Sequence, residues 1–561
     1  MKLELEFEGM TCLGCARTLE KALEAVPGVE HAGVSYPTRR GTVVASAAVA
    51  AEDLLRAAER AGYRAEVVGG DGGRAEAMTV GGPTARQQAG GGGYDYDLLV
   101  IGSGGAGMAA AIRASELGAT AAVVEGAEVV GGTCVNVGCI PSKYLIEAAH
   151  AVHTARTAFP GVAPCEPELA WREVIRKKDE IVERLRQEKY VQVLEAYHGV
   201  SLLRGRAELL GGGRVRVGDR DVKARKVLIA TGARAWAPPI PGLEEAGALD
   251  STSVMEIERL PETLIVIGGG SIGLELGQAF SRFGVRVVVI EAMERIVPGE
   301  DLDVSEALTE ALRAEGIEIH TGAKVTRVSR DENGYAVEVQ DGGLTGEIRA
   351  EQLLVATGRR PNTEGLGLEA ADVEIDGRGF VVVDDFMRTS NPDVFAAGDV
   401  VGGPGFVYVA ALQGGIAAQA ALAEVTGGEP IPIDLSATPR VTFTDPQVAA
   451  VGITEGEARA AGLLPEATSM PMEYLPRAIV SNRRRGMIKL VSEAGTDRLL
   501  GAHIVSANAG DVIGEAVLAV RFGLTTRDLL STLHAYLTWG EGLKLAAQTF
   551  TKDVAKLSCC A

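Results

Sequence analysis

The sequence has 561 residues, of which 46% are hydrophobic and 23% are charged, and its formal net charge is -20. A chain this long exceeds what one hydrophobic core usually supports, so it predicts about three to five domains of a soluble α/β kind. The negative charge disfavours nucleic acid and anionic membranes, and no signal peptide or transmembrane stretch is recognisable, so we expect a cytoplasmic protein without membrane insertion.

A small α+β unit with elements in the order βαββαβ is predicted for residues 2–68. Its stretch GMTCLGC places Cys12 and Cys15 on a loop that enters the first helix, which we expect to begin near residue 16. Two thiolates, with only His31 nearby, suit a low-coordinate soft metal ion better than zinc, which takes four ligands. A redox CxxC is the alternative. The glycine-rich residues 69–93 predict a flexible linker.

After the linker, residues 94–125 predict a strand, a glycine-rich turn, a helix and a second strand. The turn contains Gly102, Gly104 and Gly107 in a G-x-G-x-x-G pattern, and Glu125 ends the second strand. Such glycines let the backbone approach a pyrophosphate at a helix N-terminus, and the carboxylate accepts from a ribose hydroxyl. The context favours a dinucleotide site over a plain tight turn.

The next motif, GGTCVNVGCIPSK, places Cys134 and Cys139 just before a predicted helix. Pro141 suits the first helical turn, and Lys143 adds a positive charge. A thiol at a helix N-terminus beside a cation has a lowered pKa, because the thiolate is stabilised by free amides and by the charge. We therefore predict a redox-active pair, with buried structural cysteines as the alternative. Cys165 has no partner in sequence and is assigned to packing.

The strand, glycine turn and helix pattern returns with Gly268, Gly270, Gly273 and a terminal acid, Glu291. Two dinucleotide sites in one chain imply two different dinucleotides, most simply a flavin and a nicotinamide. A carboxylate at Glu291 repels a 2′-phosphate and so favours NADH over NADPH. Arg295 lies close enough in sequence to weaken that preference, and a solvated strand end is the alternative for Glu291.

Together these motifs resemble the pyridine nucleotide-disulfide oxidoreductases, from about residue 94 to the end of the chain. The resemblance extends to VLIATGARA, LLVATGRRPN and NPDVFAAGDV. It implies two Rossmann-like domains, for FAD and for NADH or NADPH, followed by a C-terminal α/β dimerisation domain and hence a homodimer. The further cofactor-binding positions that it implies are Thr133, Thr231, Gly232, Gly358 and Asp399.

The same resemblance implies roles and boundaries. Cys139 would face the flavin, Cys134 would exchange with substrate, and Lys143 would pair with Glu275 near the flavin ring. Asp399 would contact the ribityl or phosphate region of FAD. The implied domains are an FAD-binding domain at 94–240 and 366–430, an NAD(P)-binding domain at 241–365 and a dimerisation domain at 431–561.

The C-terminal end separates branches of the family. Disulfide reductases carry His-Pro-Thr-x-x-Glu, whose histidine serves as acid and base, but here Tyr536 replaces that histidine. His534 lies two positions earlier and is assigned a structural role. The chain ends in Ser-Cys-Cys, and Cys559 with Cys560 can present two soft sulfurs to one soft ion, an idle oxidisable tail being the alternative. The branch that reduces mercuric ion ends similarly, and Tyr190 and Tyr536 match tyrosines at its metal site.

The N-terminal unit resembles heavy-metal-associated domains, which have a ferredoxin-like βαββαβ fold. With the tail and Tyr536, it implies an enzyme that takes Hg(II) from small-thiol complexes and reduces it to Hg(0), using Cys12, Cys15, Cys559 and Cys560 for delivery. Two alternatives stay open. One is a lipoamide dehydrogenase-like disulfide reductase, and the other is a protein that traffics copper or another soft metal.

Overall fold

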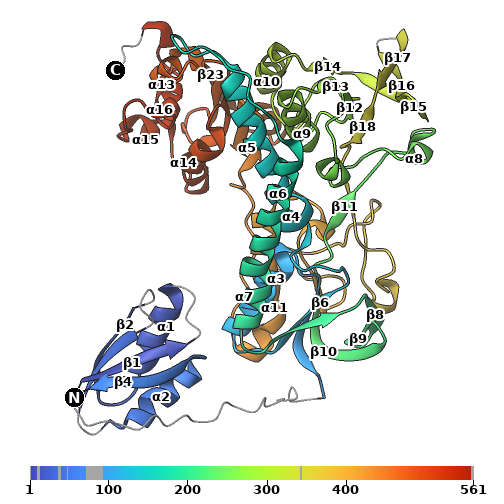
Figure 1. Ribbon diagram of the computed structural model, residues 1–561. Coiled ribbons are helices and arrows are strands. Elements are labelled where there is room, and N and C mark those ends of the chain that lie inside the picture. The colour runs from blue at the N-terminus through green and yellow to red at the C-terminus, as the bar shows by residue number, and fades with distance from the viewer. Residues whose placement is uncertain are drawn as a thin grey trace. The chain divides into compact units, whose positions relative to one another are not determined.

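The structure is a computed structural model, and the chain divides into two compact units, one of residues Met1–Gly93 with Val193–Gly199 and one of the remainder (Figure 1). Among the helices it describes, none is both long enough and apolar enough to cross a membrane. The mixed α/β class expected from the sequence is confirmed. The described residues are 2–8, 13–35, 40–46, 49–70, 93–341 and 344–556.

The N-terminal unit is a four-stranded antiparallel sheet with two helices, and the predicted βαββαβ order is confirmed. Alternation along the first strand buries Leu5 and Phe7 on one face, where Leu54 of the second helix packs. The first helix begins at Leu13, three residues before the predicted start. The elements are β1 (Lys2–Glu8), α1 (Leu13–Glu24), β2 (Val29–Ser35), β3 (Arg40–Ala45), α2 (Ala51–Arg60) and β4 (Arg64–Gly70), and the sheet order is β2-β3-β1-β4.

The second unit begins with a sheet whose central strands are parallel and buried along their C-terminal halves, as expected for a strand, turn and helix repeat. Its order is β7-β6-β5-β10-β9-β8, with β20 also paired to β10, and α11 (Val407–Thr426) packs on α3. The elements are β5 (Tyr96–Ile101), α3 (Gly105–Glu116), β6 (Ala121–Glu125), β7 (Val200–Arg204), β8 (Ala207–Gly211), β9 (Arg214–Val217), β10 (Arg220–Ile229) and β20 (Val394–Ala396).

A second parallel sheet, ordered β14-β13-β12-β18, repeats this design, and a three-stranded antiparallel sheet is inserted in the chain between β14 and β18. The elements are β12 (Thr263–Ile267), α9 (Ser271–Arg282), β13 (Arg286–Ile290), α10 (Leu302–Ala314), β14 (Glu318–His320) and β18 (Gln352–Val355), with β15 (Ala323–Asp331), β16 (Gly334–Asp341) and β17 (Leu344–Ala350) in the antiparallel sheet.

The C-terminal part is an antiparallel sheet ordered β21-β22-β25-β24-β23 and covered by short helices. The last α-helix of this part ends at Gln548, where the hydroxyl of Thr549 donates to the carbonyl of Ala546 and lies 2.6 Å from Thr468 Oγ1. The elements are β21 (Arg440–Thr442), β22 (Gln447–Gly452), β23 (Pro465–Pro471), α13 (Pro476–Val480), β24 (Met487–Glu493), β25 (Leu499–Ser506), α14 (Ala509–Arg521), α15 (Thr526–Ser531) and α16 (Glu541–Gln548).

Two long helices, α5 (Cys139–Arg156) and α6 (Trp171–Arg186), run side by side between these sheets (Figure 1). Trp171 fixes them to the second parallel sheet: its ring packs on Phe280 and Phe283 of the α9 region, and its indole N–H donates to the carbonyl of Ile257 at 3.0 Å. Leu145, Ala149 and Val152 of α5 pack in the same core.

Candidate active site

The first glycine-rich turn joins β5 to α3 and forms a dinucleotide cradle. Gly104 is the N-cap of α3, so free amides of the first helical turn face outward. A Cβ atom on Gly107 would lie 1.9 Å from the carbonyl oxygen of Gly102, so the helix can approach the turn only with glycine there. Glu125, at the end of β6, accepts hydrogen bonds from the amide and hydroxyl of Ser103. Its carboxylate is held where a ribose would bind.

The second turn, between β12 and α9, has the same construction. Gly270 is the N-cap of α9, and a Cβ atom on Gly273 would lie 2.1 Å from the carbonyl oxygen of Gly268. Glu291 follows β13 and accepts from the amide of Gly269 at 2.7 Å. Both predicted cradles are therefore preformed, each with an acid fixed at the end of its second strand.

Asp399 and Arg359 meet near the first cradle. Burial raises the pKa of the Asp399 carboxyl above its usual value, although Arg359 opposes that rise. The Nε of Arg359 is buried without a hydrogen-bond partner and lies 3.6 Å from Asp399 Oδ2. Its Nη2 reaches Thr133 Oγ1 at 3.5 Å. A buried, unsatisfied guanidinium nitrogen beside a half-buried carboxylate fits a polar, phosphate-bearing flavin nucleotide.

Thr231 and Gly232 lie where the chain crosses from the first parallel sheet to the second. The hydroxyl of Thr231 donates to the carbonyl of Asn362 at 2.8 Å, and the Asn362 amide nitrogen donates back to the carbonyl of Thr231 at 2.9 Å. Gly358 has a φ of +135°, a backbone conformation that favours glycine. Arg359, missed from the sequence, directly follows it, and its signal was the RR of LLVATGRRPN.

The two inner cysteines lie in different helices. Cys134 is in the short helix α4 (Gly132–Val137) and Cys139 is the first residue of α5, whereas the sequence predicted both before one helix. Gly138 separates the helices because its backbone angles fit neither. Both cysteines are free thiols. A hydrogen bond from the Cys134 thiol is the largest cause that lowers the pKa of Cys139 to about 7, and the same bond raises the pKa of Cys134. Above pH 7 the pair holds a thiolate at Cys139.

Lys143 and Glu275 form the ion pair that the sequence predicted. Lys143 Nζ lies 2.6 Å from Glu275 Oε2 and 4.7 Å from the ring centroid of Phe443. Glu275 is 6% exposed, and its Oε1 accepts from the amide of Phe443 at 2.8 Å. The charge of Lys143 lowers the pKa of Cys139, while the charge of Glu275 opposes it. The pair thus tunes the thiolate and ties α5 to α9.

Replacing Lys143 with glutamine is expected to raise the pKa of Cys139 above about 7, because a cation that stabilises the thiolate is removed. The measurement is the rate of alkylation of Cys139 by iodoacetamide as a function of pH, read by mass spectrometry of the full-length protein. The control is Lys552→Gln, at an exposed lysine of the C-terminal part. A midpoint unchanged from the wild type would contradict the role of Lys143.

Tyr190 lies in a π-helical turn, η1 (Gln187–Val191), that follows α6. Such turns often occur at functional sites because they re-aim a side chain. A Cβ atom on Gly131, at the start of α4, would lie 3.4 Å from Cδ1 of Tyr190. Burial, and then the charges of Cys134 and Cys139, raise the pKa of Tyr190. Its ring therefore borders the cysteine pair.

Tyr536 is not joined to the cysteine pair of its own chain. It lies in the loop between α15 and α16, is 53% exposed, and Figure 1 shows these helices well apart from α4. His534 Nε2 lies 2.7 Å from Glu515 Oε1 and its side chain is 6% exposed, which agrees with the structural role expected for it.

The structure describes only some of the remaining cysteines. Cys12, Cys559 and Cys560 lie outside the described residues, and of Cys15 only the backbone, within α1, is described, so their metal-binding roles stay predictions. Cys165 is exposed, and its assignment to packing is wrong. It lies in an extended segment between α5 and α6, where only its backbone amide is held, by the carbonyl of Ala155 at 2.9 Å.

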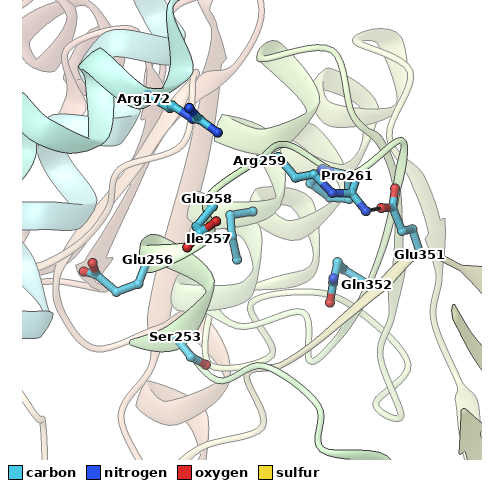
Figure 2. Close-up of a pocket in the computed structure, with 9 residues that line it drawn as sticks. All are labelled: Arg172, Ser253, Glu256, Ile257, Glu258, Arg259, Pro261, Glu351 and Gln352. Carbon is cyan, nitrogen blue, oxygen red and sulfur yellow. Dashed lines mark ion pairs between the residues drawn. The ribbon is translucent and has the colours of Figure 1, made fainter.

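A surface cavity of about 420 Å³ lies between α6 and the second parallel sheet (Figure 2). Figure 2 shows Arg259 ion-paired to Glu351 at one side, while Arg172 faces the cavity from α6. None of the predicted site residues that the structure describes lines it. Its exposed charges of both signs give no chemistry related to the thiol pair.

The segment 442–445 of the C-terminal part is hydrogen-bonded along one face of α9. Ser271 Oγ lies 2.6 Å from Thr442 Oγ1, and Gln278 bridges both the amide and the carbonyl of Asp445 at 2.8 Å. Asp445 also forms ion pairs with His150 of α5, Arg282 of α9 and Arg483. Burial favours the neutral acid, but His150, Arg483 and Arg282 outweigh it and hold the pKa of Asp445 far below its usual value.

Asp445→Asn is expected to lower the urea midpoint of the second unit, because Arg282 keeps its buried charge but loses a carboxylate partner, a change that costs roughly 3 kcal/mol. A carboxyl whose folded pKa is depressed stabilises the fold above its unfolded pKa, and this contribution is lost as pH falls through the folded pKa. The loss in the free energy of unfolding caused by Asp445→Asn should therefore be full at neutral pH and become smaller in acid. Asp385→Asn, at an exposed aspartate, is the control; equal midpoints for both variants would contradict the role of Asp445.

Comparisons with known proteins cover the whole chain. Residues 96–414 match the family described as pyridine nucleotide-disulphide oxidoreductase, residues 438–547 match the dimerisation domain of that family, and residues 4–64 match a heavy-metal-associated domain. Mercuric reductases of Bacillus cereus and Lysinibacillus sphaericus are each 42% identical over 100% of this chain, covering 87% and 100% of their own lengths. A Cu(II) complex of the flavoprotein disulfide reductase RclA from Escherichia coli superposes with a TM-score of 0.72 and 30% identity over 82% of this chain and 99% of that one.

Proposed function

The chain belongs to the pyridine nucleotide-disulphide oxidoreductase family and is an oxidoreductase, and on that premise we propose that it is a mercuric reductase. The overall reaction is Hg(II) + NAD(P)H → Hg(0) + NAD(P)⁺ + H⁺, which transfers two electrons to the metal. The observation that carries this proposal is the pair of sulfurs of Cys134 and Cys139, which are joined by a hydrogen bond that lowers the pKa of Cys139, because two soft sulfurs are the ligands that a soft, low-coordinate ion prefers.

FAD and NAD(P)H are the cofactors of this family, and the two cradles fit them. Bound FAD supplies the redox chemistry, taking a hydride from the nicotinamide and delivering two electrons at the cysteine pair. We assign the nicotinamide dinucleotide to Gly268, Gly270, Gly273 and Glu291. The residues assigned to FAD are Gly102, Gly104, Gly107, Glu125, Thr133, Lys143, Thr231, Gly232, Gly358 and Asp399.

The inner pair has two different tasks in this proposal. Cys139, the lower-pKa thiol, is adjacent to the Lys143–Glu275 pair and faces the flavin side. Cys134 exchanges thiolates with the incoming mercury complex, so that each Hg–S bond is replaced by another and no free ion is released. Tyr190 forms the wall of the same site and limits the access of water.

Tyr536, Cys559 and Cys560 act, in this proposal, on the site of a second copy of the chain. The exposed position of Tyr536 on the C-terminal part supports this arrangement, and residues 438–547 match a dimerisation domain. The tail would receive Hg(II) from small-thiol complexes and pass it to Cys134 and Cys139 of the other subunit. The homodimer is thus required for a complete site.

The N-terminal unit is proposed as a second point of capture. Its match to heavy-metal-associated domains supports Cys12 and Cys15 as soft-metal ligands. A metal held by two thiolates moves onward by exchange, so this unit increases the local supply rather than performing chemistry. The need for reduced nicotinamide and reduced thiols favours the cytoplasm as the compartment.

Substrate comparison tests the proposal against its alternatives. The FAD-loaded full-length protein, with excess thiol, should oxidise NAD(P)H when Hg(II) is added, and should turn over neither lipoamide nor glutathione disulfide, because Tyr536 stands where the acid–base histidine of disulfide reductases is found. Disulfide turnover without a mercury response would support the lipoamide dehydrogenase-like alternative instead.

Copper is the second candidate ion, because the structurally similar flavoprotein from Escherichia coli forms a Cu(II) complex. If the chain is chiefly a copper-trafficking protein, removal of residues 1–93 should abolish its metal response. If it is a mercuric reductase, the shortened protein should keep mercury-dependent NAD(P)H oxidation when small thiols are abundant, since Cys134 and Cys139 remain.

A further inference from the structure

The position of Cys134 relative to Cys139 depends on how α4 is held from outside. The two cysteines lie in different helices, and the chain leaves helical geometry between them at Gly138, whose φ is −128° and whose ψ is −109°. The Cys134 thiol nevertheless donates a hydrogen bond to Cys139. Because α4 does not continue α5, contacts with other elements must keep the two sulfurs within reach of each other.

The side chain of Asn136 closes the turn that leads into the Cys134 helix. Asn136 lies in α4, two residues after Cys134. Its amide nitrogen donates to the carbonyl oxygens of Val130 and Gly132, both at 2.9 Å. The carboxamide thereby joins the body of α4 to the turn from which the helix starts.

Arg186, the last residue of α6, binds the oxygen of the same carboxamide. Its Nε donates to Asn136 Oδ1 at 2.7 Å, a hydrogen bond that the positive charge of the donor strengthens. Its Nη1 lies 2.5 Å from Oε2 of Glu183, whose side chain is 55% exposed, whereas that of Arg186 is 18% exposed. The contact with Asn136 thus ties α4 to α6, the helix against which it lies (Figure 1).

Gly131 is the point at which Asn136 and Tyr190 meet. A Cβ atom on Gly131 would lie 3.4 Å from Asn136 Nδ2, 3.4 Å from Tyr190 Cδ1 and 2.6 Å from Val135 Cγ1. The π-helical turn η1 begins directly after Arg186 and places the Tyr190 ring on this bare face. One end of α6 therefore brings both a hydrogen-bond donor and an aromatic ring to the Cys134 helix.

The elements on both sides of this turn are themselves fixed. Towards the first cradle, the amide of Gly131 donates to Ser103 Oγ at 2.9 Å, and the Ser103 hydroxyl donates to Glu125 at 2.5 Å. On the other side, Lys178 of α6 is 1% exposed and donates to the carbonyl of Met255 at 2.9 Å. Side chains that extend from such rigid elements can fix a reactive group accurately.

We propose that Arg186 is a positioning residue for the inner cysteine pair. Through the N–H at its Nε it fixes Asn136, and Asn136 holds the Cys134 helix and the Tyr190 turn in register. The sulfur of Cys134 is thereby kept within reach of Cys139. The inference rests on the proposed function in taking these two cysteines as the redox-active pair.

Thiol–disulfide exchange tests the inference without mercury. Oxidised dithiothreitol takes two electrons and two protons from the two thiols, which leaves the Cys134–Cys139 disulfide and reduced dithiothreitol. The equilibrium constant of this exchange depends on how closely the two sulfurs are held. The measurement is mass spectrometry of alkylated peptides from the FAD-loaded full-length protein, equilibrated without oxygen.

Two uncharged side chains at position 186 separate the N–H group from the charge. In Arg186→Met a methyl group stands in the place of Nε and cannot donate, so the constant should fall about fivefold or more. In Arg186→Gln the amide nitrogen stands in the same place and donates, so the constant should stay within about twofold of the wild type. Arginine, methionine and glutamine have similar helix propensities, so altered stability of α6 does not explain a difference.

Arg184→Met, at an exposed arginine of the same helix, is the control and should match the wild type. Equal constants in Arg186→Met and Arg186→Gln would overturn the inference, because the ion pair with Glu183 is lost in both. A wild-type constant in Arg186→Met would also overturn it.

If Arg186→Met loses its FAD, Arg186→Ala takes its place, because water can then bind Asn136 Oδ1 and preserve the fold without fixing α4. The same fall in the constant is expected, and a folded alanine variant with the wild-type constant would refute the role of Arg186. Since no mercury is present, these outcomes are independent of the proposed reductase activity.

Discussion

Cys134→Ser should reduce mercury-dependent NAD(P)H oxidation on the order of a thousandfold or more, while reduction of the flavin by NAD(P)H continues. A hydroxyl can still donate a hydrogen bond to Cys139, but it does not form the exchangeable bond to Hg(II), so the sulfur ligand that receives the ion is lost. The flavin is reduced at the nicotinamide site, which this substitution leaves intact. Stopped-flow absorbance separates the two steps.

The matched control is Cys165→Ser, because Cys165 is exposed and lies in a segment outside the site. It should keep wild-type turnover with Hg(II) and wild-type reduction of the flavin. If Cys134→Ser retained more than a tenth of the wild-type turnover, the pair could not be the place where Hg(II) is reduced. Equal losses of turnover in Cys134→Ser and Cys165→Ser would instead indicate that the effect is not specific to the inner pair.

The double variant Cys559→Ser, Cys560→Ser should lose about a hundredfold in turnover when Hg(II) is held by excess small thiol. The tail thiols are proposed to extract the ion from such complexes, and without them the inner pair must compete directly from within a half-buried site. With thiol-bound mercury as the substrate, the double variant should have a lower kcat. The rate at which NAD(P)H reduces the flavin should not change.

Ser558→Ala, at the residue before the tail pair, is the control and should behave as the wild type. Mixing the double tail variant with Cys134→Ser adds a second test, because heterodimers that combine one intact tail with one intact inner pair should recover activity. Absence of recovery despite subunit exchange would contradict delivery from one subunit to the other.

The parts of the site that were predictable are those carried by local patterns. The glycine turns with Glu125 and Glu291 follow from strand, turn and helix spacing, and the two cradles have the expected form. The Lys143–Glu275 pair was predicted from the family resemblance and is confirmed at 2.6 Å. A lowered pKa of Cys139 was also expected, but its largest cause is the hydrogen bond from the Cys134 thiol, to which the charge of Lys143 adds.

The parts that were missed depend on contacts between distant segments. Asp445 joins α5, α9 and the C-terminal sheet, a meeting that no spacing in the sequence encodes. Arg295 was read as a cation close enough to weaken the preference set by Glu291, yet one of its guanidinium nitrogens donates to two carbonyls three and five residues away, which only the folded loop reveals. Cys165 was assigned to packing from residue type alone, but its segment lies at the surface.

The release of elemental mercury tests the central claim most directly. Purified full-length protein, loaded with FAD and supplied with NADH, excess thiol and Hg(II), should release volatile Hg(0), trapped and counted downstream, in a one-to-one ratio with the NADH oxidised. That ratio follows from the two electrons that each step moves. Oxidation of NADH with no mercury in the trap, or with all of it still bound as Hg(II), would contradict the assignment.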